Sequence, residues 1–237
     1  MKYIFSVEGN IGSGKSTLLK EMKTKIKKIQ YYDVIYLQEP VDTWESFKDE
    51  NGKNIIESFY ENNEKFAFSF QMMAYISRLH QLKTTLKNNN NIIIITERSI
   101  HTDREVFAKM LYDQKNMSKI EHEIYNKWFD QFLEECKIDG IIYVNTSPIK
   151  CLQRINKRNR KGEDNMSIDY LKDCNTYHDN WIETSDIDNL ILDGNENYGS
   201  RNYLNWVDYI KEFINSKIDS EYEKSFNYQF FLNHPFC

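Results

Sequence analysis

The sequence has few of the residues that interrupt regular structure. It contains 8 glycines and 3 prolines in 237 residues, which argues against long disordered linkers because such linkers are usually rich in both. It also lacks a positive balance of charge, since 36 acidic residues outnumber 31 basic ones and the net charge is −5. General nucleic-acid binders are usually basic, so we expect no nucleic-acid partner, although a local basic site stays possible.

No apolar run approaches the length of a transmembrane helix, so we expect no membrane partner. The cysteines have neither CxxC spacing nor the clustered histidines of a zinc site, and they are Cys136, Cys151, Cys174 and Cys237. We therefore expect reduced cysteines in a cytoplasmic protein. Because the motif described next begins at residue 9, we expect neither a signal peptide nor a transit peptide.

A glycine-rich motif lies near the N-terminus. Residues 9–16 read GNIGSGKS and fit the pattern of glycine, four residues, glycine, lysine and serine. Glycines let successive N–H groups turn toward a phosphate, and the following helix adds the positive end of its dipole. Lys15 can reach the outer phosphates, and the Ser16 hydroxyl can hold Mg²⁺. The motif predicts binding of a nucleoside triphosphate by Gly9, Asn10, Ile11, Gly12, Ser13, Gly14, Lys15, Ser16 and Thr17.

Short apolar, β-branched runs alternate with long helical patterns along the chain. The runs are residues 2–7, 34–37, 92–96, 141–144 and 190–192. Strands of this kind are buried on both faces, and their alternation with helices predicts an α/β fold with a five-stranded parallel sheet covered by helices. The clearest helical patterns span residues 64–87, 101–113, 118–136 and 200–216. We expect one domain over 1–216, with a lid near 154–165, and an aromatic tail over 217–237 of unknown role.

Charged residues follow the strands at the edge where ligands bind in parallel sheets. Glu39 follows the second strand, and Glu97 and Arg98 follow the third. A carboxylate at a strand end is often a helix cap or a solvated residue. The three groups together, beside a phosphate loop, favour a reaction site instead.

Two further patterns add polar groups to this edge. Gln71, Ala74 and Arg78 are spaced i, i+3 and i+7 within one helical pattern, so they share a stripe of that helix, which could also be a solvated face. Arg154, Arg158 and Arg160 follow the fourth strand, where arginines can neutralise the charge of a transferred phosphoryl group.

Several motifs in order resemble the deoxyribonucleoside kinase family, in its deoxycytidine/deoxyguanosine kinase branch, from about residue 3 to residue 215. They are the 9–16 loop, Glu39-Pro40-Val41 with Trp44, Tyr60, Phe70-Gln71, Glu97-Arg98-Ser99, Asp103-Arg104, residues 139–143, and Arg158-x-Arg160. The resemblance implies a three-layer P-loop NTPase-type sandwich of thymidylate-kinase-like topology. It also implies transfer of the γ-phosphoryl group of ATP, with Mg²⁺, to the 5′-hydroxyl of a deoxynucleoside.

The resemblance assigns roles to individual residues. Glu39 matches the general base, with Arg98 positioning it, and Glu97 matches the carboxylate that helps Ser16 to hold Mg²⁺. Tyr60 and Glu163 match the pair that binds the sugar 3′-hydroxyl, with Asp164 as the alternate for Glu163. The remaining matches are Gln71 for the nucleobase edge; Trp44, Phe70 and Phe107 for the walls of the base slot; Arg154, Arg158 and Arg160 for the lid; and Glu196, Asn197 and Tyr198 for the donor adenine.

Three positions bear on the choice of substrate. Ala74, Arg78 and Asp103 match the deoxycytidine/deoxyguanosine branch, whereas thymidine-preferring members have bulkier or less polar residues there. A charged Arg78–Asp103 pair can bind an exocyclic amino group and suits the 5-methyl group of thymine poorly. We therefore expect deoxycytidine or a deoxypurine to be the better substrate.

Two other functions remain open from the sequence. A thymidylate-kinase-like monophosphate kinase also has Glu-Pro after its second strand, but followed by glycines, whereas Val41-Asp42-Thr43-Trp44 stands here. A non-catalytic nucleotide-binding subunit would not need Lys15, Glu39, Glu97 and Arg98. The resemblance further implies a homodimer, for which residues 64–87 and 118–136 are the candidate helices.

Overall fold

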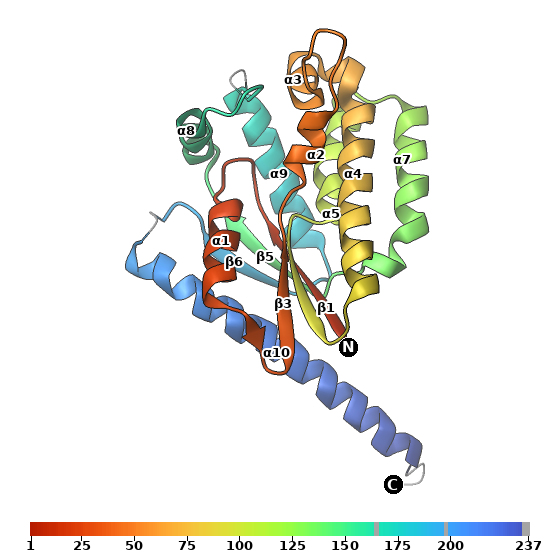
Figure 1. Cartoon of the computed structure of the whole chain (residues 1–237), viewed down its shortest axis with the longest axis vertical. Coiled ribbons are helices and arrows are strands. Elements are labelled where there is room, and N and C mark those ends of the chain that lie inside the picture. The colour runs from red at the N-terminus through yellow and green to blue at the C-terminus, as the bar shows by residue number, and fades with distance from the viewer. Residues whose placement is uncertain (164–165, 197–198, 234–237) are drawn as a thin grey trace.

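The computed structural model describes residues 1–163, 166–196 and 199–233. In this part of the chain six strands form one sheet in the order β2-β3-β4-β1-β5-β6 (Figure 1). Their bounds are β1 (Lys2–Glu8), β2 (Lys28–Ile29), β3 (Tyr32–Leu37), β4 (Ile92–Glu97), β5 (Gly140–Asn145) and β6 (Asn189–Asp193). The first strand is central, because β1 pairs in parallel with both β4 and β5.

The five predicted strands are confirmed as parallel neighbours, but the predicted number is wrong. The sixth strand, β2, has two residues and pairs antiparallel with β3. So short a strand leaves no alternating pattern in the sequence, because its pairing depends on the tight connection to β3 rather than on its own side chains.

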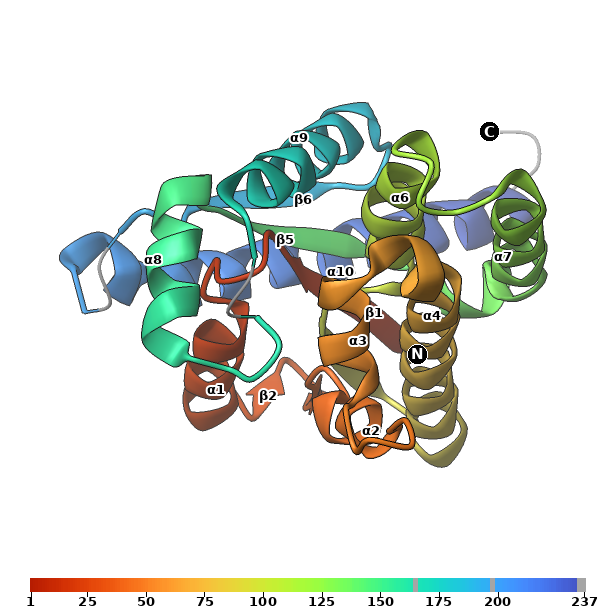
Figure 2. The ribbon, with the colours of Figure 1, turned by 90° about the horizontal axis from the view of Figure 1, so that it is seen from above.

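Helices cover both faces of the sheet, as predicted (Figures 1 and 2). Successive side chains of a strand point to opposite faces, so Ile4 packs in one apolar cluster while Phe5 packs in the other. The Phe5 face carries α1 (Lys15–Lys25) and α10 (Arg201–Asn233), and the Ile4 face carries α4 (Asn63–Asn88), α7 (Lys119–Phe132) and α9 (Ile168–Thr184).

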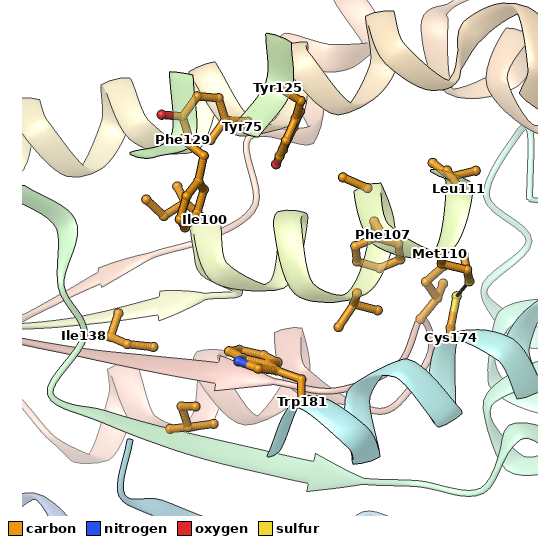
Figure 3. Packing of buried hydrophobic residues seen from close by; sticks show 14 of the residues in the cluster. Tyr75, Ile100, Phe107, Met110, Leu111, Tyr125, Phe129, Ile138, Cys174 and Trp181 are labelled. Carbon is orange, nitrogen blue, oxygen red and sulfur yellow. Dashed lines mark hydrogen bonds between the residues drawn. The ribbon is translucent and has the colours of Figure 1, made fainter. Parts of the chain in front are cut away.

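The Ile4 face holds the larger core. Figure 3 shows its centre, where Tyr75 of α4 meets Tyr125 and Phe129 of α7. Between these helices and α9 runs one nearly continuous helical segment, made of α5 (Ile100–Thr102), the π-helical turn η1 (Asp103–Ala108) and α6 (Lys109–Asp113). Its buried side chains include Ile100, Phe107, Met110 and Leu111.

The remaining elements connect these layers. Helices α2 (Val41–Ser46) and α3 (Ile55–Glu61) follow β3, the 3₁₀ turn η2 (Glu134–Cys136) follows α7, and α8 (Pro148–Arg158) follows β5. The predicted start of α7 is confirmed by a capping box between Ser118 and Glu121. None of the helices in the described part of the chain is long and apolar enough to cross a membrane.

The last helix differs from its prediction. We expected it to end at residue 216, but α10 continues to Asn233 and its C-terminal part projects beyond the body of the protein (Figure 1). The helical pattern of residues 200–216 comes from packing against the sheet, so the sequence carries no such pattern where the helix leaves that surface.

Candidate active site

A cavity of about 470 Å³ opens above the carboxyl ends of the parallel strands. It extends from the phosphate loop (residues 9–16) to a slot between α2, α3 and α4, with the lid along its side. The predicted residues that line it are Ile11, Gly12, Ser13, Gly14, Lys15, Ser16, Thr17, Glu39, Trp44, Tyr60, Phe70, Gln71, Ala74, Arg78, Glu97, Arg98, Asp103, Phe107, Arg154, Arg158, Arg160, Glu163 and Glu196.

The phosphate loop is packed closely against the elements behind it. Gly12 has φ +77°, and a Cβ atom there would lie 2.7 Å from the carbonyl oxygen of Cys151 in α8. A Cβ atom at Gly9 would lie 2.6 Å from the carbonyl oxygen of Val144 in β5. Both contacts are with backbone, so these two positions require glycine.

Lys15 is buried at the base of the loop. Its ammonium donates to the carbonyl oxygens of Gly9 at 3.0 Å and Asn10 at 2.7 Å. Burial, and next the charge of Arg98, lower the pKa of Lys15 to about 7. An incoming phosphate would supply the negative charge that restores its ordinary basicity.

Glu39 lies between two arginines at the centre of the cavity. Its Oε1 accepts hydrogen bonds from Arg98 Nη1 and, at 2.7 Å, from Arg78 Nη2. Burial alone would raise the pKa of the Glu39 carboxyl, but the charges of Arg98, Arg78 and Lys15 outweigh it and hold the pKa well below its usual range. The group is therefore a carboxylate, fixed in position and able to accept a hydrogen bond.

Arg98 has an unusual backbone conformation. Its φ is +59°, in the left-handed region that non-glycine residues seldom adopt. Its N–H donates to the carbonyl oxygen of Val7 at 3.0 Å, and its guanidinium lies 5.1 Å from the ring centroid of Phe107. The turn brings the side chain back over the end of β1, beside the phosphate loop.

The slot between α2, α3 and α4, which Trp44, Phe70 and Phe107 line, ends in charged groups. Arg78 Nε donates to Asp103 Oδ1 at 3.2 Å and lies 3.1 Å from Oδ2. Burial raises the pKa of Asp103 to about 6, against the lowering effect of Arg78 and Arg98.

One amide in the slot has hydrogen-bonding capacity to spare. Gln71 is buried and lines the cavity, and within the described residues its Oε1 has no hydrogen-bond partner. A buried polar atom without a partner is costly, so a ligand that donates to it would be favoured.

Oxygen ligands for a metal meet at the phosphate loop. The Ser16 hydroxyl donates to Glu97 Oε1, so a hydroxyl and a carboxylate oxygen are adjacent. Among the described residues there is no cluster of three or more histidine, cysteine, aspartate or glutamate side chains that could hold a metal. Mg²⁺ commonly takes one or two protein oxygens together with substrate phosphates, so Ser16 and Glu97 fit this ion.

The three arginines that follow β5 and line the cavity are held by protein groups. Arg158 Nη2 donates to Glu163 Oε2 at 2.5 Å, and Arg160 Nη1 donates to Glu163 Oε1 at 3.3 Å. Arg154 Nη1 donates to the carbonyl oxygen of Ser13 at 2.8 Å, within the phosphate loop. Burial, and next the charge of Glu163, raise the pKa of Tyr60 above its usual range, so its phenol stays protonated as a donor.

A few predicted residues are not in this cavity. Gly9 and Asn10 belong to the loop but do not line it, and Asn197, Tyr198 and the alternate Asp164 lie outside the described residues. Sequence reasoning missed other lining residues, namely Lys20, Ile56, Tyr170, Gly194, Tyr203 and Trp206. Most of them lie on helices that carry no motif, so no signal in the sequence pointed to them.

Known proteins resemble this chain over most of its length. Residues 5–215 match the family model described as deoxynucleoside kinase. The chain is 32% identical over 243 residues to deoxycytidine kinase 1 of Xenopus laevis, covering 89% of this chain and 90% of that protein. It is 32% identical over 241 residues to human deoxycytidine kinase, with the same coverage. It is 27% identical over 195 residues to the mitochondrial deoxyguanosine kinase of Xenopus laevis, covering 75% of this chain and 72% of that protein.

Proposed function

Because the chain belongs to the deoxynucleoside kinase family, and is thus an ATP-binding phosphotransferase of nucleotide salvage, we propose that it phosphorylates the 5′-hydroxyl of deoxycytidine or a deoxypurine nucleoside in preference to thymidine. The observation that carries the proposal is the Glu39 carboxylate, fixed by Arg98 and Arg78 between the phosphate loop and the base slot. A carboxylate in that place can accept a proton from a hydroxyl that faces the donor phosphate.

In the proposed step, the 5′-oxygen forms a bond to the γ-phosphorus, and the bond from that phosphorus to the bridging oxygen of ATP breaks. ADP leaves, and the hydroxyl proton passes to Glu39. Phosphoryl transfer has a loose transition state in which the proton leaves late, so an acceptor of low basicity suffices if it is well placed. Arg98, which donates to Glu39, would hold both the carboxylate and the attacking oxygen.

Positive charge around the triphosphate supports the same step. Lys15 and the lid arginines Arg154, Arg158 and Arg160 can neutralise charge on the transferred group. Ser16 and Glu97 would hold Mg²⁺, which would supply further neutralisation of charge when bound. Glu196 lines the end of the cavity beyond the loop, where we propose that the donor base binds.

We propose that the slot recognises the acceptor from both ends. Tyr60 and Glu163 would bind the sugar 3′-hydroxyl, and the free Gln71 Oε1 would accept a hydrogen bond from the base edge. At the far end, Asp103 can accept from an exocyclic amino group while Arg78 donates to a ring acceptor. Ala74 leaves space there, and thymine would set a methyl group against charged atoms.

We further propose a homodimer that acts in the cytoplasm. The exposed face of α7 carries Ile120, Ile124 and Trp128 at i, i+4 and i+8, and these side chains are 70%, 41% and 50% exposed. An apolar stripe of this kind on a helix is typical of an interface, and a second copy would present the same stripe. Cys136, Cys151 and Cys174 are free thiols, which suits a reducing compartment.

The test incubates the protein with ATP, Mg²⁺ and each of the four deoxynucleosides or dTMP, with Glu39→Gln in parallel. The control is Asp42→Asn, which removes an exposed carboxylate from α2 close to Glu39. We expect deoxycytidine or a deoxypurine to give its 5′-monophosphate. Loss of a general base lowers rates by about 10²- to 10⁴-fold, which we expect for Glu39→Gln and not for Asp42→Asn.

Each other outcome has a distinct meaning. Preference for thymidine would leave the reaction intact and contradict the roles of Arg78 and Asp103. Phosphorylation of dTMP alone would identify a monophosphate kinase. An unchanged rate for Glu39→Gln would remove Glu39 as the base.

A further inference from the structure

A buried carboxylate lies beneath the cavity and does not line it. Glu8 is the last residue of β1, directly before the phosphate loop, and it is fully buried. Its Oε1 accepts a hydrogen bond from Ser99 Oγ at 2.7 Å, and its Oε2 accepts one from Thr102 Oγ1. Among residues 1–163, 166–196 and 199–233, no lysine or arginine forms an ion pair with Glu8.

A buried carboxylate that forms no ion pair costs free energy, so Glu8 is an unusual residue for the end of a strand. Its neighbour Val7 and most other positions of β1 are apolar and buried, so an apolar residue at position 8 would avoid the cost of removing a charge from water. The two hydroxyl bonds offset part of that cost, and the nearby charge of Arg78 offsets more of it. The presence of Glu8 at this position is therefore best explained by the chain segment to which the two hydroxyls belong.

Both hydroxyls belong to the segment that carries the arginine of the site. Ser99 follows Arg98, whose φ is +59°, and its side chain also caps α5 by accepting from the Thr102 N–H at 3.4 Å. Thr102 directly precedes the turn η1, which bears Asp103 and Phe107. Figure 3 shows this segment continuing from Ile100 to Leu111 between two packed layers.

We propose that Glu8 is a positioning residue for phosphoryl transfer. Its carboxylate ties the end of β1 to the turn after β4 and to the start of α5, which keeps Arg98 in its left-handed conformation with its guanidinium on Glu39. A backbone conformation of this kind persists only where its surroundings determine it. The inference rests on the proposed function of the cavity, and it adds a residue that contacts neither substrate.

The experiment compares Glu8→Ala, Glu8→Gln and Thr102→Val with the wild type, measuring kcat, the acceptor KM and the melting temperature. Glutamine can still accept from one hydroxyl and donate to the other, because serine and threonine hydroxyls do both. Asp139→Ala is the matched control. Asp139 also holds β1 by accepting from the Ile4 N–H at 2.7 Å, but at the strand's other end, away from the cavity.

We expect Glu8→Ala to lower kcat by about 100-fold, as a misplacement of about 1 Å does, with a smaller change in acceptor KM. Thr102→Val should lower kcat by about tenfold, the effect of losing one hydrogen bond to a charged group. Glu8→Gln should restore most of the rate. Asp139→Ala should lower the melting temperature without lowering kcat.

A double variant completes the test. If Thr102 acts through Glu8, the effect of Thr102→Val should disappear in the Glu8→Ala background. An unchanged kcat in Glu8→Ala, or an undiminished effect of Thr102→Val in the double variant, would overturn the proposal. If Glu8→Ala does not fold, an unchanged kcat in Thr102→Val overturns it instead. A wild type that phosphorylates no deoxynucleoside would count against the proposed function rather than against the role of Glu8.

Discussion

His178 is a fully buried titratable residue of α9 that does not line the cavity. Its Nδ1 is 2.7 Å from the carbonyl oxygen of Cys174, which fixes the proton on that nitrogen, and its ring stacks on Tyr143. Burial, followed by the charge of Arg98, lowers the pKa of His178 to about 3. The native protein therefore holds this imidazole neutral.

A neutral buried histidine makes stability depend on pH. Below pH of about 6.5 the unfolded chain binds a proton that native His178 does not bind, so the free energy of unfolding falls until the pH nears the native pKa. We expect the stability of the wild type relative to His178→Gln to decrease by about 2 kcal/mol between pH 7 and pH 5. Urea unfolding at both pH values measures this difference. A difference that does not change with pH would mean that the native ring accepts a proton.

Periodicity and motifs could predict single residues only where a pattern marked them. Gln71, Ala74 and Arg78 share a helical stripe, and the structure brings all three to one cavity wall. Trp206 and Tyr170 line the same cavity but lie on helices whose other residues either pack in the core or face solvent, so nothing in the sequence distinguished them. Glu8 had a signal that we did not use, since a charged residue rarely ends a strand buried on both faces.

At the scale of elements, the phosphate loop depends on its contact with α8. A methyl group at Gly12 would push the loop away from Cys151, because the clashing atom is backbone. We expect Gly12→Ala to weaken ATP binding about 10- to 100-fold, the cost of losing one hydrogen bond to a charged group. Isothermal titration calorimetry gives the affinity.

The control for this variant is Gly52→Ala. Gly52 also has a positive φ, of +79°, but nothing lies within 4 Å of the added carbon. The Gly52→Ala variant should lose stability through backbone strain and keep the ATP affinity of the wild type. An equal loss of ATP affinity in both variants would show that backbone strain, and not the contact with α8, causes the effect at Gly12.

Elements were predictable in proportion to how regularly they are buried. The central strands β1, β4 and β5 are recognisable in the sequence because they are buried on both faces, and α4 was predicted to within one residue at each end. Helices α2 and α3 are short and carry mixed contacts, so their patterns are weak. The extent of α10 beyond residue 216 could not be read, because pattern arguments detect a buried face and that part of the helix projects from the body.

At the scale of the whole molecule, the α7 stripe leads to a prediction about assembly. We expect the wild type to have twice the 28.5 kDa mass of one chain, and Trp128→Glu to be monomeric, because a charge would be buried in the interface. Light scattering coupled to size-exclusion chromatography measures the mass. Tyr31→Glu is the control, as Tyr31 is 88% exposed but distant from α7 in sequence and sheet position. A monomeric wild type would contradict the proposed dimer.

The central place of β1 has a consequence for how the chain is made. During synthesis the strand that carries the phosphate loop emerges first, yet its partners Ile92 and Gly140 are translated much later. Contacts between residues so distant in sequence form slowly, so the apolar first strand stays unpaired on both edges until β4 and β5 have been synthesised. We expect nascent chains that stop before residue 140 to bind no nucleotide, despite containing the whole glycine-rich motif. We therefore expect nucleotide binding to begin late in synthesis, after β5 has paired with β1.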